Sequence, residues 1–104
     1  MTVIAVTKAR VHVVKSGGRL RLVISGADLD HCIGRDVAVV IRRPDGVYRY
    51  VVKLPRRRGR RYVAYLQKAL HDPLILEAYR RGLALEADVQ CIDAARRTAA
   101  ETNR

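Results

Sequence analysis

Apolar residues recur at every second position over much of residues 3–54, and the pattern breaks where residues that favour turns occur. A repeat of two places successive side chains on opposite faces of a β-strand, so it favours strands over helices. Leu20, Leu22 and Ile24, for example, alternate with Arg19, Arg21 and Val23. The first half of the chain is therefore predicted to be a β region whose strands have one apolar and one basic face.

Two turns divide this region into two hairpins. Ser16-Gly17-Gly18 separates an alternating stretch around Val11 and Val13 from the one around Leu22. The sequence Arg43-Pro44-Asp45-Gly46 separates residues 37–41 from residues 48–54, with Pro and Gly in positions that β-turns favour. Residues 26–34, which connect the hairpins, are predicted to form a short helical turn closed by Gly34.

After residue 61 the spacing of apolar residues becomes that of helices. Residues 62–70 are predicted to be helical, Asp72-Pro73 reads as the N-cap and first residue of a second helix, and Gly82 ends or kinks it. Leu85, Val89 and Ile92 form a narrow apolar seam on a third, C-terminal helix. We expect an α+β fold, with a small β-barrel-like region of two hairpins followed by C-terminal helices.

The change from a strand pattern to a helix pattern divides the chain into two predicted regions. Residues 1–61 are predicted to be a basic β domain that binds nucleic acid, and residues 62–104 a helical appendage for dimerisation or partner docking. Because a two-fold dimer is the commonest way for a small chain to cover an apolar stripe, we expect a homodimer that buries Leu85, Val89 and Ile92.

The positive charge is confined to the first region. Residues 1–61 hold 15 Lys and Arg against 4 Asp and Glu, whereas residues 62–104 hold 6 of each, so the formal net charge of +11 arises before residue 62. Residues 55–61 read Pro-Arg-Arg-Arg-Gly-Arg-Arg. A field of one sign over one region attracts polyanions, and guanidinium groups suit bidentate contacts with phosphates and base edges.

The candidate nucleic-acid-binding residues are cations on the strand phase opposite to the predicted core, together with the arginine run. They are Arg19, Arg21, Arg42, Arg49, Lys53, Arg56, Arg57, Arg58, Arg60 and Arg61, and Lys15 joins them only through the resemblance described below. Arg10 shares this phase. Tyrosines 48, 50, 62 and 65 flank the arginines, where they either stack on bases or, as their apolar phase favours, fill the core.

Asp28-Leu29-Asp30-His31-Cys32 is the only cluster dense in catalytic residue types. It has no partner at the spacing of a catalytic or metal site, so we expect Asp28 and Asp30 to cap the short helix and Cys32 and Ile33 to point inward. Cys32 and Cys91 are predicted to be reduced thiols. We therefore expect no catalytic residue, metal or cofactor, and a protein that is not an enzyme.

The longest purely apolar stretch, residues 37–41, is too short to cross a bilayer, and the N-terminus shows no signal peptide. We expect a cytoplasmic protein, associated with the nucleoid if it binds DNA. Asn, Gln and Met are scarce, which is compatible with a heat-adapted source.

Residues 8–54 resemble the AbrB/SpoVT family of swapped-hairpin DNA-binding domains. The resemblance rests on Lys15-Ser16-Gly17-Gly18-Arg19-Leu20-Arg21-Leu22-Val23-Ile24, a short helix, Gly34-Arg35-Asp36-Val37 and a second hairpin with Asp45-Gly46. It implies that two chains interlace into one barrel and that Lys15, Arg19 and Arg21 contact DNA.

The function predicted from these features is that of a small basic nucleic-acid-binding protein, a DNA-binding transcriptional or chromatin-associated regulator. Two alternatives stay open. The first is an RNA-binding or ribonucleoprotein component, and the second is an antitoxin-like adaptor that binds a protein partner through its C-terminal helices.

Overall fold

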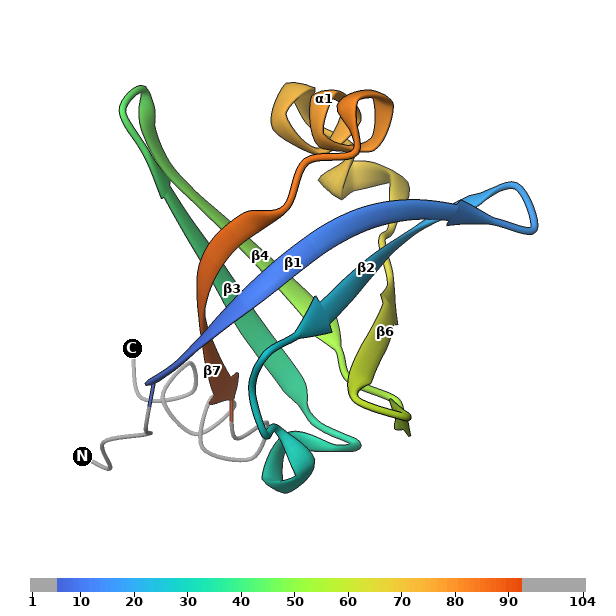
Figure 1. Cartoon of the computed structure of the whole chain (residues 1–104), viewed down its shortest axis with the longest axis vertical. Helices are drawn as coiled ribbons and strands as arrows, with labels where there is room; N and C mark the ends of the chain where they lie inside the picture. Colours follow the sequence, from blue (N-terminus) through green and yellow to red (C-terminus); the bar gives the residue numbers. More distant parts are fainter. Residues whose placement is uncertain (1–5, 93–104) are drawn as a thin grey trace, which may run out of the picture.

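The computed structural model describes residues 6–92, which form one open antiparallel sheet of seven strands with a single α-helix (Figure 1). The strands are β1 (Val6–Ser16), β2 (Arg19–Ser25), β3 (Asp36–Arg43), β4 (Gly46–Lys53), β5 (Arg57–Arg58), β6 (Arg61–Tyr65) and β7 (Leu85–Ile92). Their order across the sheet is β4-β3-β7-β1-β2-β6-β5. Two 3-10 turns, η1 (Asp30–Cys32) and η2 (Lys68–Leu70), and the helix α1 (Pro73–Arg81) complete the described chain.

Both predicted hairpins are confirmed. In β1–β2, Ser16 pairs with Arg19 across Gly17 and Gly18, whose positive φ angles of 60° and 78° suit the tight turn that glycine allows. In β3–β4, Arg43 pairs with Gly46 across the two-residue connection. The short helical turn between the hairpins is also present, as η1.

The predicted α+β fold with a barrel-like region and C-terminal helices is wrong. The sheet is open, and residues 61–65 and 85–92 are strands instead of helices. Leu85 and Val89 are four residues apart, a spacing that fits one face of a helix and one face of a strand equally well. Ala87 and Cys91, buried between and beyond them, show that the period is two. The part of the expected helix beyond Ile92 lies outside the described residues.

The expected helix that starts with Asp72 and Pro73 is confirmed as α1. The Asp72 carboxylate accepts a hydrogen bond of 2.9 Å from the Ile75 amide, and Gly82 ends the helix in the left-handed conformation at φ 61°. Its nine residues are too few to span a bilayer, and the described chain contains no other α-helix.

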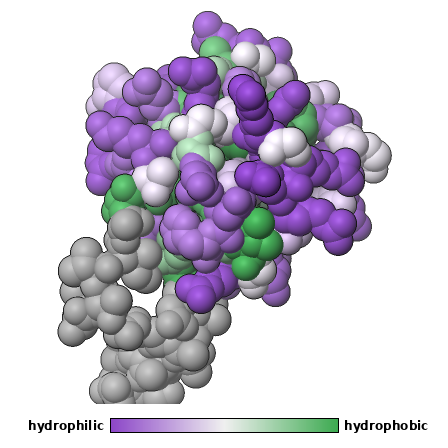
Figure 2. All heavy atoms as spheres, turned by 60° about the horizontal axis from the view of Figure 1, so that its bottom comes forward, coloured by the Kyte–Doolittle hydropathy of each residue, from purple (hydrophilic) through white to green (hydrophobic). Residues whose placement is uncertain are grey.

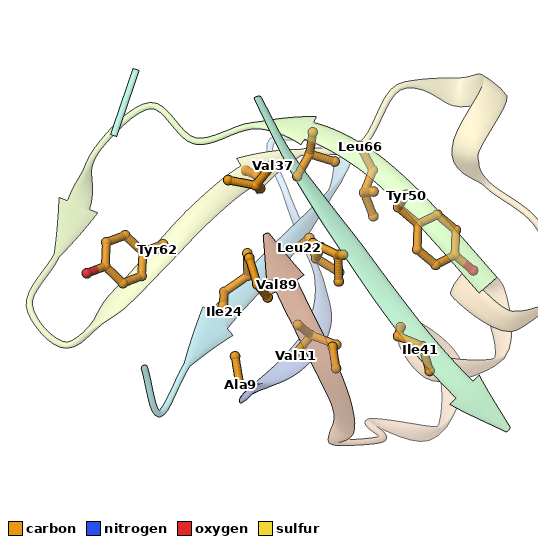
Figure 3. Close-up of a cluster of buried hydrophobic side chains, with 14 of the residues drawn as sticks. Ala9, Val11, Leu22, Ile24, Val37, Ile41, Tyr50, Tyr62, Leu66 and Val89 are labelled. Carbon is orange, nitrogen blue, oxygen red and sulfur yellow. The ribbon is translucent and has the colours of Figure 1, made fainter. Parts of the chain in front are cut away.

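The core lies inside the folded sheet. In Figure 1, β1 and β2 cross over β3 and β4, and the two halves come together where β4 contacts β6. Val11, Leu22, Val37 and Val89 are among the side chains that point into this space from β1, β2, β3 and β7 (Figure 3). Leu74, Ile75 and Ala78 of α1 belong to the same core. Strands from both sides of residue 61 thus build one sheet around one core.

Candidate nucleic-acid interface

The outward side chains of β2 and β6 form a surface that we call the β2–β6 outer face. Leu20, Leu22 and Ile24 of β2 are buried, so the alternation turns the intervening residues outward. The surface consists of Arg19, Arg21 and Ser25 from β2 and Arg61, Val63 and Tyr65 from β6, whereas Val23 shares their phase but is buried. As the sequence predicted, the cations of β2 lie on the phase opposite to the core.

Strand register places arginines side by side at one end of this face. Arg58 pairs with Arg61 between β5 and β6, Arg61 pairs with Ser25 of β2, and Ser25 pairs with Arg10 of β1. Neighbouring strands lie about 4.8 Å apart, so the three guanidinium-bearing residues form a row across four strands. We call Arg10, Arg61 and Arg58 the arginine row.

The turn between β5 and β6 extends this row with further exposed cations. Arg56, Arg58, Arg60 and Arg61 form no ion pair with any other described residue. Arg57 differs, because its guanidinium lies 3.2 Å from the Asp30 carboxylate of η1. Four arginines of the run are therefore free to bind anions, and the fifth links the turn to η1.

At the other end of the β2–β6 outer face, Arg21 lies over the ring of Tyr65. The centre of its guanidinium is 4.7 Å from the ring centroid, within the range of a cation–π contact. The Arg21 Nε is shielded from solvent and has no hydrogen-bond partner among the described residues. Tyr65 is still 53% exposed. The exposed Tyr65 ring is thus an aromatic surface that packs against the Arg21 guanidinium.

The remaining predicted cations lie elsewhere. Arg42, Arg49 and Lys53 lie on the outer face of the β3–β4 hairpin, where Arg42 forms an ion pair with Asp88 of β7. Of these three residues, Lys53 lines a hollow together with Tyr65 of β6. Lys15 is exposed but follows the inward phase of Val11 and Val13, beyond the end of the core. The predicted residues therefore share exposure, but they do not form one continuous surface.

A hollow of about 480 Å³ over β7 also contains cations, but carboxylates balance them. Lys8 and Arg10 of β1 pair in register with Asp88 and Glu86 of β7, and Arg42 binds Asp88. Arg10 therefore belongs both to this hollow and to the arginine row. The hollow is a poorer site for a polyanion than Arg61 and Arg58, the part of the row that has no carboxylate beside it. The end of the molecule that lies lowest in Figure 1 is largely hydrophilic, with hydrophobic residues in small separate spots (Figure 2).

The prediction of reduced cysteines is wrong, because Cys32 and Cys91 form a disulfide whose Cα atoms are 5.5 Å apart. The two residues are 59 positions apart in the chain, and only the folding of β7 into the sheet centre brings them together. His31 and the two sulfurs are the only set of three potential metal ligands in the described part of the chain. In the disulfide form neither sulfur is a thiolate, so this set cannot hold a metal or act as a nucleophile.

The acidic residues beside this disulfide have structural contacts. Asp28 Oδ1 accepts a hydrogen bond of 3.1 Å from the Asp30 amide. The N-cap of η1 is Leu29, without a side-chain cap, so the predicted capping by Asp28 and Asp30 is wrong. Asp30 accepts a hydrogen bond of 2.8 Å from the Tyr62 hydroxyl, which itself accepts one from the Leu29 amide. Burial, and then the Asp30 carboxylate, raise the pKa of Tyr62. Cys32 is buried as predicted, but Ile33 is 38% exposed, so its predicted inward orientation is wrong.

The four tyrosines near the arginines divide between the core and the surface. Tyr50 and Tyr62 are buried, as their apolar phase predicted. Tyr48 is partly buried and donates a hydrogen bond to Asp45 at 2.6 Å. Tyr65 is on the outward phase, and its four-residue distance from Arg61 on the same strand could have indicated this.

The residues assigned to dimerisation have another role in this structure. Leu85 and Val89 are buried in the core of their own chain, and Ile92 is half-buried on the outward phase of β7. There is no apolar helical seam to cover, so the physical argument for dimerisation through these residues no longer holds.

Comparisons with protein-family models, with curated proteins and with solved structures found no match. The resemblance of residues 8–54 to the AbrB/SpoVT family stays a prediction from the sequence.

Proposed function

We propose that this protein binds nucleic acid through the arginine row, the β5–β6 turn and the β2–β6 outer face. The observation that supports this most directly is the register that places Arg10, Arg61 and Arg58 in one row, with Arg60 in the adjacent turn and Arg56 just before β5. Arg61 and Arg58 have no carboxylate partner among the described residues, whereas Arg10 lies opposite Glu86 of β7. Guanidinium groups without carboxylate partners match the regular negative charges of a phosphate backbone. A role as a solvated surface alone would not require these arginines to align across four strands.

DNA is the polymer that we propose first, with a non-enzymatic role in transcription or chromatin organisation and without a cofactor. RNA binding in a ribonucleoprotein is the alternative. Homodimer formation needs a surface other than Leu85 and Val89, because both are buried in the core of their own chain.

A DNA-binding role places the protein in the cytoplasm, with the nucleoid. Disulfides are rare in that compartment, except in proteins of hyperthermophiles. The Cys32–Cys91 disulfide and the scarcity of Asn, Gln and Met therefore fit this location best in a heat-adapted cell.

Fluorescence anisotropy with a labelled oligonucleotide tests the proposal. Affinity should fall as salt rises, with a log–log slope of about −0.9 for each phosphate neutralised on duplex DNA. The double variant Arg58→Gln/Arg61→Gln should bind more weakly to every sequence, and its slope should be shallower by up to about 1.8.

The matched control is Arg80→Gln/Arg81→Gln, which removes the same charge from the last turn of α1, away from the β2–β6 outer face. This control should keep the wild-type slope apart from a small general charge effect. Equal losses in the two double variants would show that only net charge matters, and no binding at low salt would overturn the proposal. Treatment of the freshly purified protein with DNase or RNase then identifies any co-purifying polymer.

A further inference from the structure

A second hollow, of about 440 Å³, lies beside Tyr65 where β4 approaches β6. Tyr65 and Gln67 line it from β6 and the residues after it, and Val51, Lys53 and Pro55 line it from β4 and the residues after it. Asp36 of β3, which pairs with Lys53 in register, also lines it. Such a volume is on the scale of sites that hold small ligands. We call it the Tyr65 groove.

Tyr65 has a different neighbour on each side. Toward β2 it meets the Arg21 guanidinium, which covers one face of the ring. Toward β4 there is no paired strand at this level, because β5 pairs only with Arg61 and Tyr62 of β6. The exposed part of the ring is therefore open to the groove, whereas its position is fixed from the β2 side.

The chemistry around the groove matches that of a nucleotide. An aromatic ring offers a stacking surface that every base can use, and a guanidinium beneath it strengthens the contact electrostatically. Lys53 is exposed at the rim, where an ammonium group can meet a phosphate. The exposed amide of Gln67 offers both a donor and acceptors to a base edge.

A base inside a duplex cannot reach such a ring, because both of its faces are already stacked on neighbouring bases. Unpaired bases can be turned out onto an aromatic side chain, which is how proteins bind single strands. The β2–β6 outer face continues along β6 from the Tyr65 ring to the arginine row. Arg61 of that row is four residues, or about 13 Å, from Tyr65. A flexible strand can place its phosphates at the row and a base at the groove.

We infer that the protein binds single-stranded nucleic acid, with Tyr65 as the stacking platform for an unpaired base and Lys53 as a phosphate contact. This inference rests on the proposed nucleic-acid binding and narrows it to single strands. Lys53 is the only lysine of the β3–β4 hairpin, and the groove gives it a role that the cations on the rest of that hairpin face do not share.

The test compares oligo(dT), oligo(U) and a mixed-sequence duplex, each of about 12 nucleotides or base pairs, at one salt concentration. Tyr65→Ala should weaken binding to the single strands by about 5- to 150-fold, the range expected for the loss of one base–aromatic stack. Its binding to the duplex should change less than about 2-fold. Tyr65→Phe keeps the ring and should bind single strands like the wild type, whereas Tyr65→Leu should behave like Tyr65→Ala.

Tyr65→Trp gives a direct readout, because the chain contains no other tryptophan. Its fluorescence should be quenched when oligo(dT) or oligo(U) binds, and it should stay unchanged with the duplex. The two single strands separate DNA from RNA as the source of the base. Circular dichroism and the urea midpoint of each variant confirm that it is folded.

The outcomes distinguish the inference from the proposal on which it rests. If Tyr65→Ala binds all three ligands as the wild type does, while Arg58→Gln/Arg61→Gln weakens them, the inference is overturned and nucleic-acid binding stands. A duplex preference in the wild type also overturns it. If neither set of changes alters binding, or no ligand binds, the proposed function itself fails.

Discussion

The Tyr50 hydroxyl donates a hydrogen bond of 2.7 Å to Asp72 Oδ2, and Asp72 Oδ1 accepts one of 2.9 Å from the Ile75 amide. One carboxylate thus caps the N-terminus of α1 and satisfies a buried tyrosine of β4. Leu74, Ile75 and Ala78 of α1 are part of the core. The helix is therefore held against the sheet by apolar packing as well as by the hydrogen bond between Tyr50 and Asp72.

Replacement of Asp72 by alanine should lower the free energy of unfolding by about 2 to 4 kcal/mol. Loss of a side-chain N-cap costs about 1 kcal/mol, and a buried hydroxyl without its partner costs about 1 to 3 kcal/mol. Urea denaturation of Asp72→Ala, Tyr50→Phe and the double variant measures the coupling between the two side chains. Strict additivity of the two single effects would contradict a direct interaction. Tyr48→Phe, which loses only the more exposed hydrogen bond to Asp45, is the control and should cost less than about 1 kcal/mol.

The same contact makes stability depend on alkaline pH. Burial, followed by the hydrogen bond to Asp72, raises the pKa of Tyr50 well above its ordinary value of 10.0. The unfolded chain therefore loses this proton at lower pH than the folded chain. Stability from this group is complete below about pH 10 and falls as pH rises toward the folded pKa, by up to about 1.4 kcal/mol per pH unit.

Urea midpoints between pH 9 and pH 11, about the window in which an unperturbed tyrosine titrates, test this dependence. The wild type should lose stability more steeply over this window than Tyr50→Phe, which has no phenolic proton at that position. The comparison uses the slopes, since the variant is less stable at every pH. Parallel slopes would show that Tyr50 ionises as easily in the folded chain as in the unfolded one.

The features predicted correctly from the sequence are those whose signals are local. Gly17 and Gly18 supply the positive φ angles of the first turn, and Asp72-Pro73 starts α1 with a cap and a residue preset for a helix. Alternation around Leu22 correctly assigned the buried and outward phases of β2. In each case the residues that determine the structure are neighbours in the chain.

The errors concern structure that distant residues decide. Leu85 and Val89 are four residues apart, and only pairing with β1 and β3 makes them strand residues. Pairing with β2 does the same for Tyr62 of β6. The place of β7 between β1 and β3 has no local signal, yet it accounts for the open sheet, the disulfide and the burial of the expected dimer seam.

The same difference between local signals and pairing of distant residues applies to the candidate interface. The outward phase of Arg10, Arg19 and Arg21 could be predicted from alternation. The alignment of Arg58 and Arg61 with Arg10 could not, because it depends on the register of three strand pairs. The outward phase of Tyr65 could have been inferred from its four-residue distance to Arg61 only if residues 61–65 had been recognised as a strand.

The Cys32–Cys91 disulfide should contribute substantially to stability, because it closes a long loop. With a sequence separation of 59, the chain-entropy model gives a contribution of about 4 kcal/mol. Reduction with dithiothreitol should lower the urea midpoint of the wild type, and Cys32→Ala/Cys91→Ala should have a lowered midpoint that the reductant does not change. Equal midpoints for the oxidised wild type and the double variant would show that the sheet alone holds η1 and β7 in place.

The Tyr62 hydroxyl connects β6 with Leu29, before η1, and with Asp30 of η1. Removal of this one oxygen therefore tests both contacts. The hydroxyl accepts a hydrogen bond of 2.8 Å from the Leu29 amide and donates one of 2.8 Å to Asp30, while Asp30 forms an ion pair with Arg57 of β5. Leu29 is fully buried, so its amide has no access to water when the hydroxyl is absent.

Tyr62→Phe keeps the buried ring and should lower the free energy of unfolding by about 1 to 3 kcal/mol, the cost of one buried donor without a partner. Asp30→Asn, which keeps an acceptor for Tyr62 and removes the ion pair with the half-exposed Arg57, should cost less than about 1 kcal/mol. Hydrogen exchange of the Leu29 amide gives the local readout, with strong protection in the wild type and in Asp30→Asn but faster exchange in Tyr62→Phe. Unchanged protection of Leu29 in Tyr62→Phe would show that packing alone, without this hydrogen bond, holds the segment before η1 against β6.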